Sequence, residues 1–131
     1  MYLLDTGVAN QAALANVVIR SRLAQVHGFY IPDVVVGELY YGAYWYAHLH
    51  QSTRYFDAYD AFFQRYSGSI LYGTEETGHI YSAIYAELRS KGQLIQQNDV
   101  WIAALARQYG YTIATVDKDF ERVSALMVEI W

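Results

Sequence analysis

The amino-acid sequence predicts an α/β fold, a three-layer α/β/α sandwich with a mostly parallel central sheet. Short apolar runs rich in β-branched residues alternate with longer helical patterns along the chain. This alternation is typical of parallel sheets whose two faces are covered by helices. The chain has 131 residues and contains no repeat, linker or low-complexity tract, which suits a single domain over residues 1–131.

The beginning of the chain predicts two strands with a helix between them. Residues 2–4 are a short apolar run that ends at Asp5, and residues 29–31 are a second such run. The periodicity of residues 12–26 predicts a helix. Its expected core positions are Leu14, Val17, Val18 and Leu23.

The middle of the chain predicts two helices, a short strand and a third helix. Asp33 can cap a helix over residues 34–48. An aromatic, amphipathic pattern predicts a helix over residues 51–66, and residues 70–72 predict a strand. Thr74 opens the next helix, because acidic residues follow it in the first turn.

A helix and two strands complete the chain. Good helix formers follow Asp99, and Gly110 suits the left-handed position at the end of that helix. The buried face of the helix is expected to hold Ile102, Leu105, Ala106 and Tyr109. Residues 112–116 are rich in β-branched side chains and predict a strand, and residues 127–130 predict the last one.

The composition of the chain excludes several classes of protein. There is no cysteine, so disulfides and thiolate chemistry are excluded. The net charge of −4 provides no basic footprint of the kind that coats nucleic acid. The first residues enter an apolar strand without a signal-peptide pattern, and the longest weakly charged stretch is too short to span a bilayer. We therefore expect a cytoplasmic protein without a membrane segment.

Acidic residues are expected to gather at one edge of the sheet. Asp5 and Asp117 directly follow strands, and Glu38 and Asp99 fall early in helices that begin at the same edge. In open α/β sheets the functional crevice lies at the carboxyl ends of the strands. Each acid alone is compatible with a capping or turn role, but four at one edge indicate a shared site.

Glu38 projects from an apolar helix face. It is the only formally charged residue among residues 34–53. A buried carboxylate needs a cation, a metal or a proton to compensate its charge. An all-oxygen cluster of carboxylates suits Mg²⁺ or Mn²⁺ rather than zinc, and phosphodiester hydrolysis is the natural reaction of such a site.

The order and spacing of several short motifs resemble those of PIN-domain proteins, and more closely the VapC-type toxin ribonucleases of bacterial toxin–antitoxin pairs. The resemblance covers nearly the whole chain. Each motif is weak alone, and their common order makes the signal. They are residues 3–6 (LLDT), 38–43 (ELYYGA), 98–106 (NDVWIAALA), 115–120 (TVDKDF) and 128–131 (VEIW).

The resemblance implies a PIN-like fold, an activity and a site. The implied activity is that of a metal-dependent endoribonuclease that uses Mg²⁺ or Mn²⁺ on an RNA substrate, and the implied partner is a small antitoxin protein. Hydroxyl residues beside the site match Thr6 and Thr115. The residues that match the family's catalytic and metal-binding acids are Asp5, Glu38, Asp99 and Asp117.

Some details of this site are open. Members of the family often carry asparagine or serine two residues after the first aspartate, where this chain has Gly7. A lost side-chain hydrogen bond at that position would loosen the aspartate or weaken metal binding. Asp119 competes with Asp117 as the outer ligand, and we favour Asp117 because it follows the strand directly. Lys118 and Arg122 are close enough in sequence to contact RNA phosphates.

Two other functional classes are open. A receiver-like, Mg²⁺-binding signalling domain needs an acidic pair in the first loop, whereas this chain has only Asp5 there. A catalytically weakened PIN-fold interaction module would use its aromatic helix as the functional surface, and Gly7 favours that reading. The aromatic side chains of residues 40–46 are too many for one core face, so they predict a core face together with a homodimer interface.

Overall fold

A computed structural model describes all 131 residues and contains one five-stranded sheet. The strand order is β3-β2-β1-β4-β5, and each pair of neighbours is parallel. The strands are β1 (Tyr2–Leu4), β2 (Phe29–Pro32), β3 (Ile70–Leu71), β4 (Thr112–Thr115) and β5 (Met127–Ile130). The predicted parallel sheet is confirmed.

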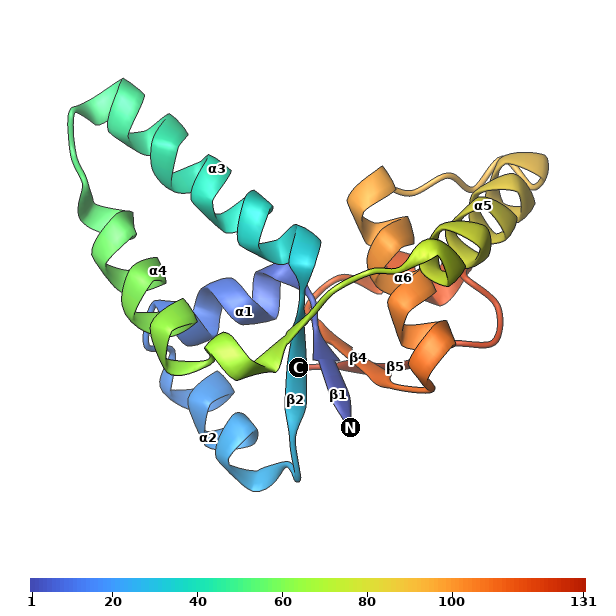
Figure 1. Ribbon diagram of the computed structural model, residues 1–131, viewed down its shortest axis with the longest axis horizontal. Helices are drawn as coiled ribbons and strands as arrows, with labels where there is room; N and C mark the ends of the chain where they lie inside the picture. The colour runs from blue at the N-terminus through green and yellow to red at the C-terminus, as the bar shows by residue number, and fades with distance from the viewer.

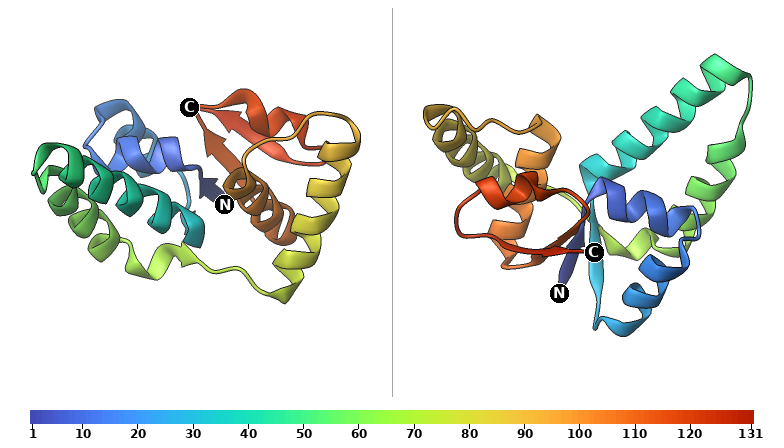
Figure 2. Two further views of the ribbon diagram at one scale, coloured as in Figure 1. Left: turned by 90° about the horizontal axis from the view of Figure 1, so that it is seen from above. Right: turned by 180° about the vertical axis from the view of Figure 1, so that it is seen from behind.

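Helices cover both faces of this sheet. They are α1 (Thr6–Ala13), α2 (Val17–Gln25), α3 (Asp33–His50), α4 (Arg54–Arg65), α5 (Glu75–Ser90) and α6 (Gln97–Tyr109). Of two short 3-10 helices, η1 (Ser67–Ser69) lies between α4 and β3, and η2 (Lys118–Arg122) lies between β4 and β5. Helices α1 to α4 lie on one side of the sheet and α5 and α6 on the other, which confirms the three layers (Figures 1 and 2).

The register of the sheet brings distant parts of the chain to one edge. Leu4 pairs with Ala114 across β1 and β4. The backbone N–H of Asp5 then donates to the carbonyl of Ala114 at 3.0 Å. Because all strands are parallel, residues that follow them lie along the same edge, where α1, α3 and α6 also begin (Figure 1).

The centre of the molecule is apolar and closely packed. The buried hydrophobic residues form one cluster, and the strands contribute fully buried Leu3, Leu4, Ile31 and Ile113. Helices α1, α3 and α6 add Val8, Val35 and Ile102, which are also fully buried. None of the helices has the length and hydropathy needed to cross a membrane.

One predicted helix is wrong, because the structure has two helices where residues 12–26 were expected to form one. Ala15 adopts a positive φ of 66°, which ends α1 and turns the chain. Asn16 then caps α2, its side chain accepting the N–H of Ile19 at 3.1 Å. The turn rotates the second helix, so that its buried residues are Ile19 and Leu23.

Three predicted core residues of this segment are therefore wrong. Leu14, Val17 and Val18 are 43%, 81% and 66% exposed, and of the expected positions only Leu23 is buried. The prediction for α6 needs a smaller correction. Its last residue, Tyr109, is 39% exposed and stacks on Tyr111 instead of entering the core. The left-handed cap at Gly110 is confirmed by its φ of 70°.

Helices α3 and α4 form a hairpin that projects from the sheet (Figure 1). Aromatic pairs hold its two helices together. Tyr44 meets Phe56 edge-on with ring centroids 4.8 Å apart, and Tyr46 meets Tyr55 in the same way at 4.8 Å. Tyr41 remains 69% exposed on the outer side. The aromatic excess thus divides into a packed face and an exposed face.

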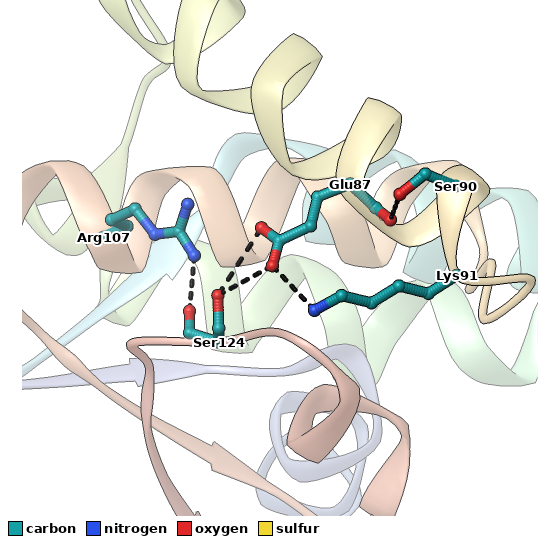
Figure 3. A network of polar contacts seen from close by, with 5 residues as sticks. All are labelled: Glu87, Ser90, Lys91, Arg107 and Ser124. Atoms are coloured by element: carbon teal, nitrogen blue, oxygen red, sulfur yellow. Dashed lines mark hydrogen bonds and ion pairs between the residues drawn. The ribbon is translucent and has the colours of Figure 1, made fainter.

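A polar network fastens the loop before β5 to α5 and α6 (Figure 3). The carboxylate of Glu87 accepts the Ser124 hydroxyl at 3.2 Å and the Lys91 ammonium at 3.0 Å. The guanidinium of Arg107 donates to the carbonyl oxygen of Ser124. The hydrogen bond from Lys91 is the largest cause that holds the pKa of Glu87 below its ordinary value.

Candidate metal centre

Asp5 occupies the end of β1 and is held by its surroundings. Its side chain is a helix cap, because Oδ1 accepts the backbone N–H of Thr6 at 2.6 Å. Its other oxygen, Oδ2, accepts the hydroxyl of Thr115 at 2.6 Å. Only 6% of Asp5 is exposed. Burial raises the pKa of Asp5, and these two hydrogen bonds oppose the rise.

Thr115 joins the two acids that follow strands. The same hydroxyl that donates to Asp5 accepts the backbone N–H of Asp117 at 2.9 Å. Asp117 in turn caps η2, because its Oδ1 accepts the backbone N–H of Asp119 at 2.9 Å. Thr115 is fully buried. It therefore fixes the orientation of the first acid and the backbone of the second.

Glu38 and Thr6 each carry a buried oxygen without a partner. Oε1 of Glu38 and Oγ1 of Thr6 are both inaccessible to solvent and form no hydrogen bond. Thr6 thus contacts Asp5 through its backbone and not through its hydroxyl. A buried polar atom left unpaired costs about 1–3 kcal/mol, so these oxygens mark a place where a polar or charged ligand would be stabilised.

Asp99, in the first turn of α6, shows that the acids act on one another. The pKa of Asp99 is raised from 3.8 to about 7, first by burial and then by the negative charges of Asp5, Glu38, Asp117 and Asp119, in that order. Glu38 and Asp117 also raise the pKa of Asp5. The structure therefore brings all four predicted acids into one electrostatic neighbourhood.

The donor set of this neighbourhood fits a hard divalent cation. It consists of carboxylate oxygens with a threonine hydroxyl nearby, and it contains no histidine or cysteine; such oxygens suit Mg²⁺ or Mn²⁺. No three acidic or histidine side chains are close enough together, as they stand, to hold one ion. Binding would therefore require these side chains to turn inward, and Oε1 of Glu38 has no hydrogen bond that such a movement would break.

Asp117 is favoured over Asp119 as the outer ligand. The negative charge of Asp117 raises the pKa of both Asp5 and Asp99, whereas that of Asp119 acts on Asp99 alone and is the smallest cause there. Asp119 also pairs with Arg122, whose guanidinium lies 3.4 Å from its carboxylate. Asp119 is therefore already partly neutralised by Arg122.

Gly7 lies against Val116, the residue between β4 and Asp117. A Cβ atom at this position would stand 2.8 Å from Cγ2 of Val116, which is closer than two unbonded carbon atoms pack. Val116 thus occupies the space that a side chain at position 7 would need. Restoring a serine or asparagine there would require Val116 to move, so Gly7 and Val116 form a matched pair.

Asp33 and Trp101 support the site but were not recognised as doing so from the sequence. Asp33 was expected only to cap a helix, and Oδ1 does accept the N–H of Val34 at 2.9 Å. The same oxygen accepts Nε1 of Trp101 at 2.9 Å, and Oδ2 accepts the N–H of Gly73 at 3.0 Å. One carboxylate thereby ties the start of α3, which carries Glu38, to the start of α6.

We expect Asp33→Ala to lower the free energy of unfolding by about 2 kcal/mol, because three donors lose their acceptor. Trp101→Phe, which removes one donor, should cost less. The matched control is Asp60→Ala, which removes a single exposed hydrogen bond from the Tyr40 hydroxyl. Urea unfolding of the variants measures the difference. Equal stability of the Asp33 and Asp60 variants would contradict a clamping role.

Comparisons with known proteins indicate the family of the chain. The family model described as PIN domain matches residues 2–126. A protein named Ribonuclease VapC2 from Haemophilus influenzae is 32% identical over 99% of this chain and 97% of its own length.

Two solved structures extend the likeness to the fold. The structure of VapBC2 from Rickettsia felis, bound to a DNA fragment from their promoter, has a chain that superposes with a TM-score of 0.85 at 26% identity, covering 99% of this chain and 98% of that one. The DNA-bound VapBC structure from Salmonella typhimurium gives a TM-score of 0.81 at 25% identity, with 99% and 97% covered.

Proposed function

Because the chain belongs to the PIN-domain family, we propose that it is a metal-dependent endoribonuclease, a single PIN-like domain that acts as the toxin of a toxin–antitoxin pair. The observation that carries the proposal is the pKa of Asp99, which burial raises to about 7 together with the negative charges of Asp5, Glu38 and Asp117. Mutually repelling carboxylates of this kind require a cation for full ionisation.

The four acids would hold Mg²⁺ or Mn²⁺ between the ends of β1 and β4 and the starts of α3 and α6. When bound, such an ion lowers the pKa of a water ligand and stabilises charge on the scissile phosphate. Asp5 is oriented by the Thr115 hydroxyl and the Thr6 N–H. The pKa of Asp99 is raised to about 7, so below that pH ion binding should release a proton and strengthen as pH rises.

A cleavage assay tests this proposal. We expect the purified protein to cut single-stranded RNA in the presence of Mg²⁺ or Mn²⁺ and to stop when a chelator is added. A single-stranded DNA of the same sequence is the matched control for substrate class. A protein that leaves RNA intact with both ions would instead support the catalytically weakened interaction module, for which Gly7 and the exposed aromatic face of α3 argue. Membership of the PIN family removes the basis for a receiver-like domain.

The partner proteins follow from the relatives and from the surface. The similar solved structures are VapBC complexes, and we propose a small antitoxin as the cognate partner of this chain, in the cytoplasm. A cluster of carboxylates would attract an arginine or lysine from such a partner. We also propose a homodimer that covers the exposed face of α3, where Tyr41 and Trp45 are 69% and 51% exposed.

Sedimentation tests the dimer. A specific dimer should stay associated at tens of micromolar protein. A dissociation constant in that range corresponds to roughly 6–7 kcal/mol of association free energy. We expect Trp45→Ala to shift the protein toward monomer, because aromatic side chains dominate such interfaces. Tyr72→Ala, which removes an aromatic residue that is 67% exposed in the loop before α5, is the control. A wild-type monomer at these concentrations would count against the dimer.

A further inference from the structure

A hollow of about 380 Å³ opens between α5 and the first residue of α6. It is lined by Tyr81, Ser82, Tyr85, Ala86, Arg89 and Gln97. We propose that this hollow is a nucleotide-binding subsite, which holds a base and a phosphate of single-stranded RNA beside the carboxylates. The inference rests on the proposed ribonuclease function and adds to it the surface that positions the substrate.

The hollow shares helix α6 with Asp99 of the candidate metal centre. Gln97 begins α6, two residues before Asp99. Tyr81 packs against Trp101 in the same part of the helix, with ring centroids 5.9 Å apart. Helices α5 and α6 lie side by side in all three ribbon views (Figures 1 and 2). A strand of RNA seated in the hollow would therefore reach the acids within a short length of chain.

The aromatic side chains of the hollow suit a nucleobase. The rings of Tyr81 and Tyr85 are stacked, with centroids 5.9 Å apart and planes inclined by 27°. Both residues are half-buried, so their positions are fixed while part of each ring stays accessible. Unpaired bases stack on such rings regardless of sequence. The amide of Gln97 can donate and accept, which suits the edge of a base.

Arg89 supplies a cation that no protein group uses. Seven of the nine lysine and arginine side chains contact a carbonyl oxygen, a carboxylate or an aromatic ring. Neither Arg89 nor Lys118 has such a contact. Lys118 directly follows Asp117, and Arg89 lines the hollow. Arg89 therefore offers the hollow a cation, and Lys118 offers another next to an acid of the candidate site; both could contact phosphates of one strand.

The charge of the molecule determines how this subsite must work. With a net charge of −4 and repelling acids at the centre, general attraction for phosphates is absent. Binding must come from base stacking and from one or two local phosphate contacts. For single strands each contact contributes about −0.7 to the slope of log affinity against log salt. We therefore expect a shallow slope of about −0.7 to −1.4, unlike that of a basic RNA-binding surface.

Binding of a fluorescein-labelled, eight-nucleotide single-stranded RNA to the Asp99→Asn protein tests the subsite. Tyr85→Leu in that background should weaken binding about tenfold, the lower part of the range for losing one stacked base. Arg89→Gln should weaken it several-fold and reduce the salt slope by about 0.7. The controls are Arg54→Gln, remote on α4, and Tyr109→Leu, at the opposite end of α6; neither should change affinity.

The same variants in the active protein separate binding from chemistry. We expect both to raise KM more than they lower kcat. Unchanged RNA affinity in both variants overturns the subsite, as does an equal loss in the controls. If Tyr85→Leu instead converts a dimer to a monomer without weakening RNA binding, the hollow is a protein contact and the inference is wrong. Because Arg89 is exposed, its variant remains informative if Tyr85→Leu fails to fold.

The outcome is independent of the proposed activity. If the wild type leaves RNA uncut, the ribonuclease proposal fails, and the binding comparison still decides whether the hollow holds RNA. If the wild type cuts RNA while the two variants bind it normally, the activity stands and the subsite is rejected.

Discussion

Asp99→Asn is expected to lower the rate of RNA cleavage about a thousandfold, with the fold intact. The substitution removes one charge from the carboxylate cluster while it preserves shape. Metal coordination contributes several kcal/mol of transition-state stabilisation, and about 4 kcal/mol corresponds to this factor. The measurement is the single-turnover cleavage rate of a short RNA at saturating Mg²⁺.

The choice of Asp99 over Asp5 matters for interpreting this experiment. Asp5 also caps α1 and accepts the Thr115 hydroxyl, so its removal is expected to damage the fold and the site together. The carboxylate of Asp99 makes no hydrogen bond in the structure, and its pKa is raised by burial and by its neighbours. Loss of activity in Asp99→Asn therefore reports on the cluster itself.

Asp119→Asn is the matched control for this substitution. Asp119 is an acid of the same neighbourhood, but it pairs with Arg122 and has the smallest influence on Asp99. We expect its replacement to lower the rate less than tenfold. If Asp119→Asn lowers the cleavage rate more than Asp117→Asn does, then Asp119 and not Asp117 is the outer metal ligand. Full activity in Asp99→Asn would remove Asp99 from the catalytic group.

The position of the acids was predictable because parallel strands share one edge. Asp5 and Asp117 are 112 positions apart, yet each follows a short apolar run, and the sheet places the ends of such runs together. Thr115 was expected beside the site only from the family resemblance, and it ends β4 beside β1. The alternation of strands and helices likewise predicted the layers, because it leaves few other arrangements for a parallel sheet.

The features that the sequence did not predict depend on single backbone angles or on long-range contacts. The break between α1 and α2 rests on the positive φ of Ala15, and alanine carries no signal for that conformation. The clamp from Asp33 to Trp101 joins residues 68 positions apart. Local patterns gave Asp33 a capping role, which is correct but incomplete. No periodicity indicates a partner so distant.

Stability without metal is expected to fall as pH rises from about 4 to about 7. The folded-state pKa of Asp99 is raised from 3.8 to about 7, so in this window the folded state binds more protons than the unfolded chain. Stability then decreases with pH, because the slope follows the difference in bound protons. Asp5, whose pKa is also raised, acts in the same direction. Above the folded-state pKa the loss is complete and the curve levels off.

Glu87, an acid outside the site, affects stability in another pH range. The pKa of Glu87 is lowered by its hydrogen bonds from Lys91 and Ser124, so its contribution is present above its unfolded pKa and is lost as pH falls. That loss lies below about pH 4.5 and does not overlap the window of Asp99. A decline in stability between pH 5 and 7 therefore reports on the carboxylate cluster.

Asp99→Asn should remove most of this decline. We expect the metal-free variant to be more stable than the wild type at pH 7.5 by on the order of 1 kcal/mol, a figure reduced because Asp99 is partly open to solvent. For a chain of this length that corresponds to a melting temperature higher by about 4 °C. Such a gain with loss of activity is the usual trade-off at a functional site.

Mg²⁺ should make the wild type more stable than the Asp99→Asn variant, the reverse of their order without metal. An ion that binds only the folded state stabilises it by about 2.7 kcal/mol at a hundredfold excess over Kd, and the variant, with one ligand fewer, should gain much less. Thermal melts of both proteins at pH 5.5 and 7.5, each with chelator and with several millimolar Mg²⁺, measure these effects. If the variant is less stable without metal and Mg²⁺ raises neither melting temperature, the acids form no shared site. The proposed cleavage would then lose its physical basis, because burial and the neighbouring negative charges together raise the pKa of Asp99, and an ion at this edge of the sheet would compensate both.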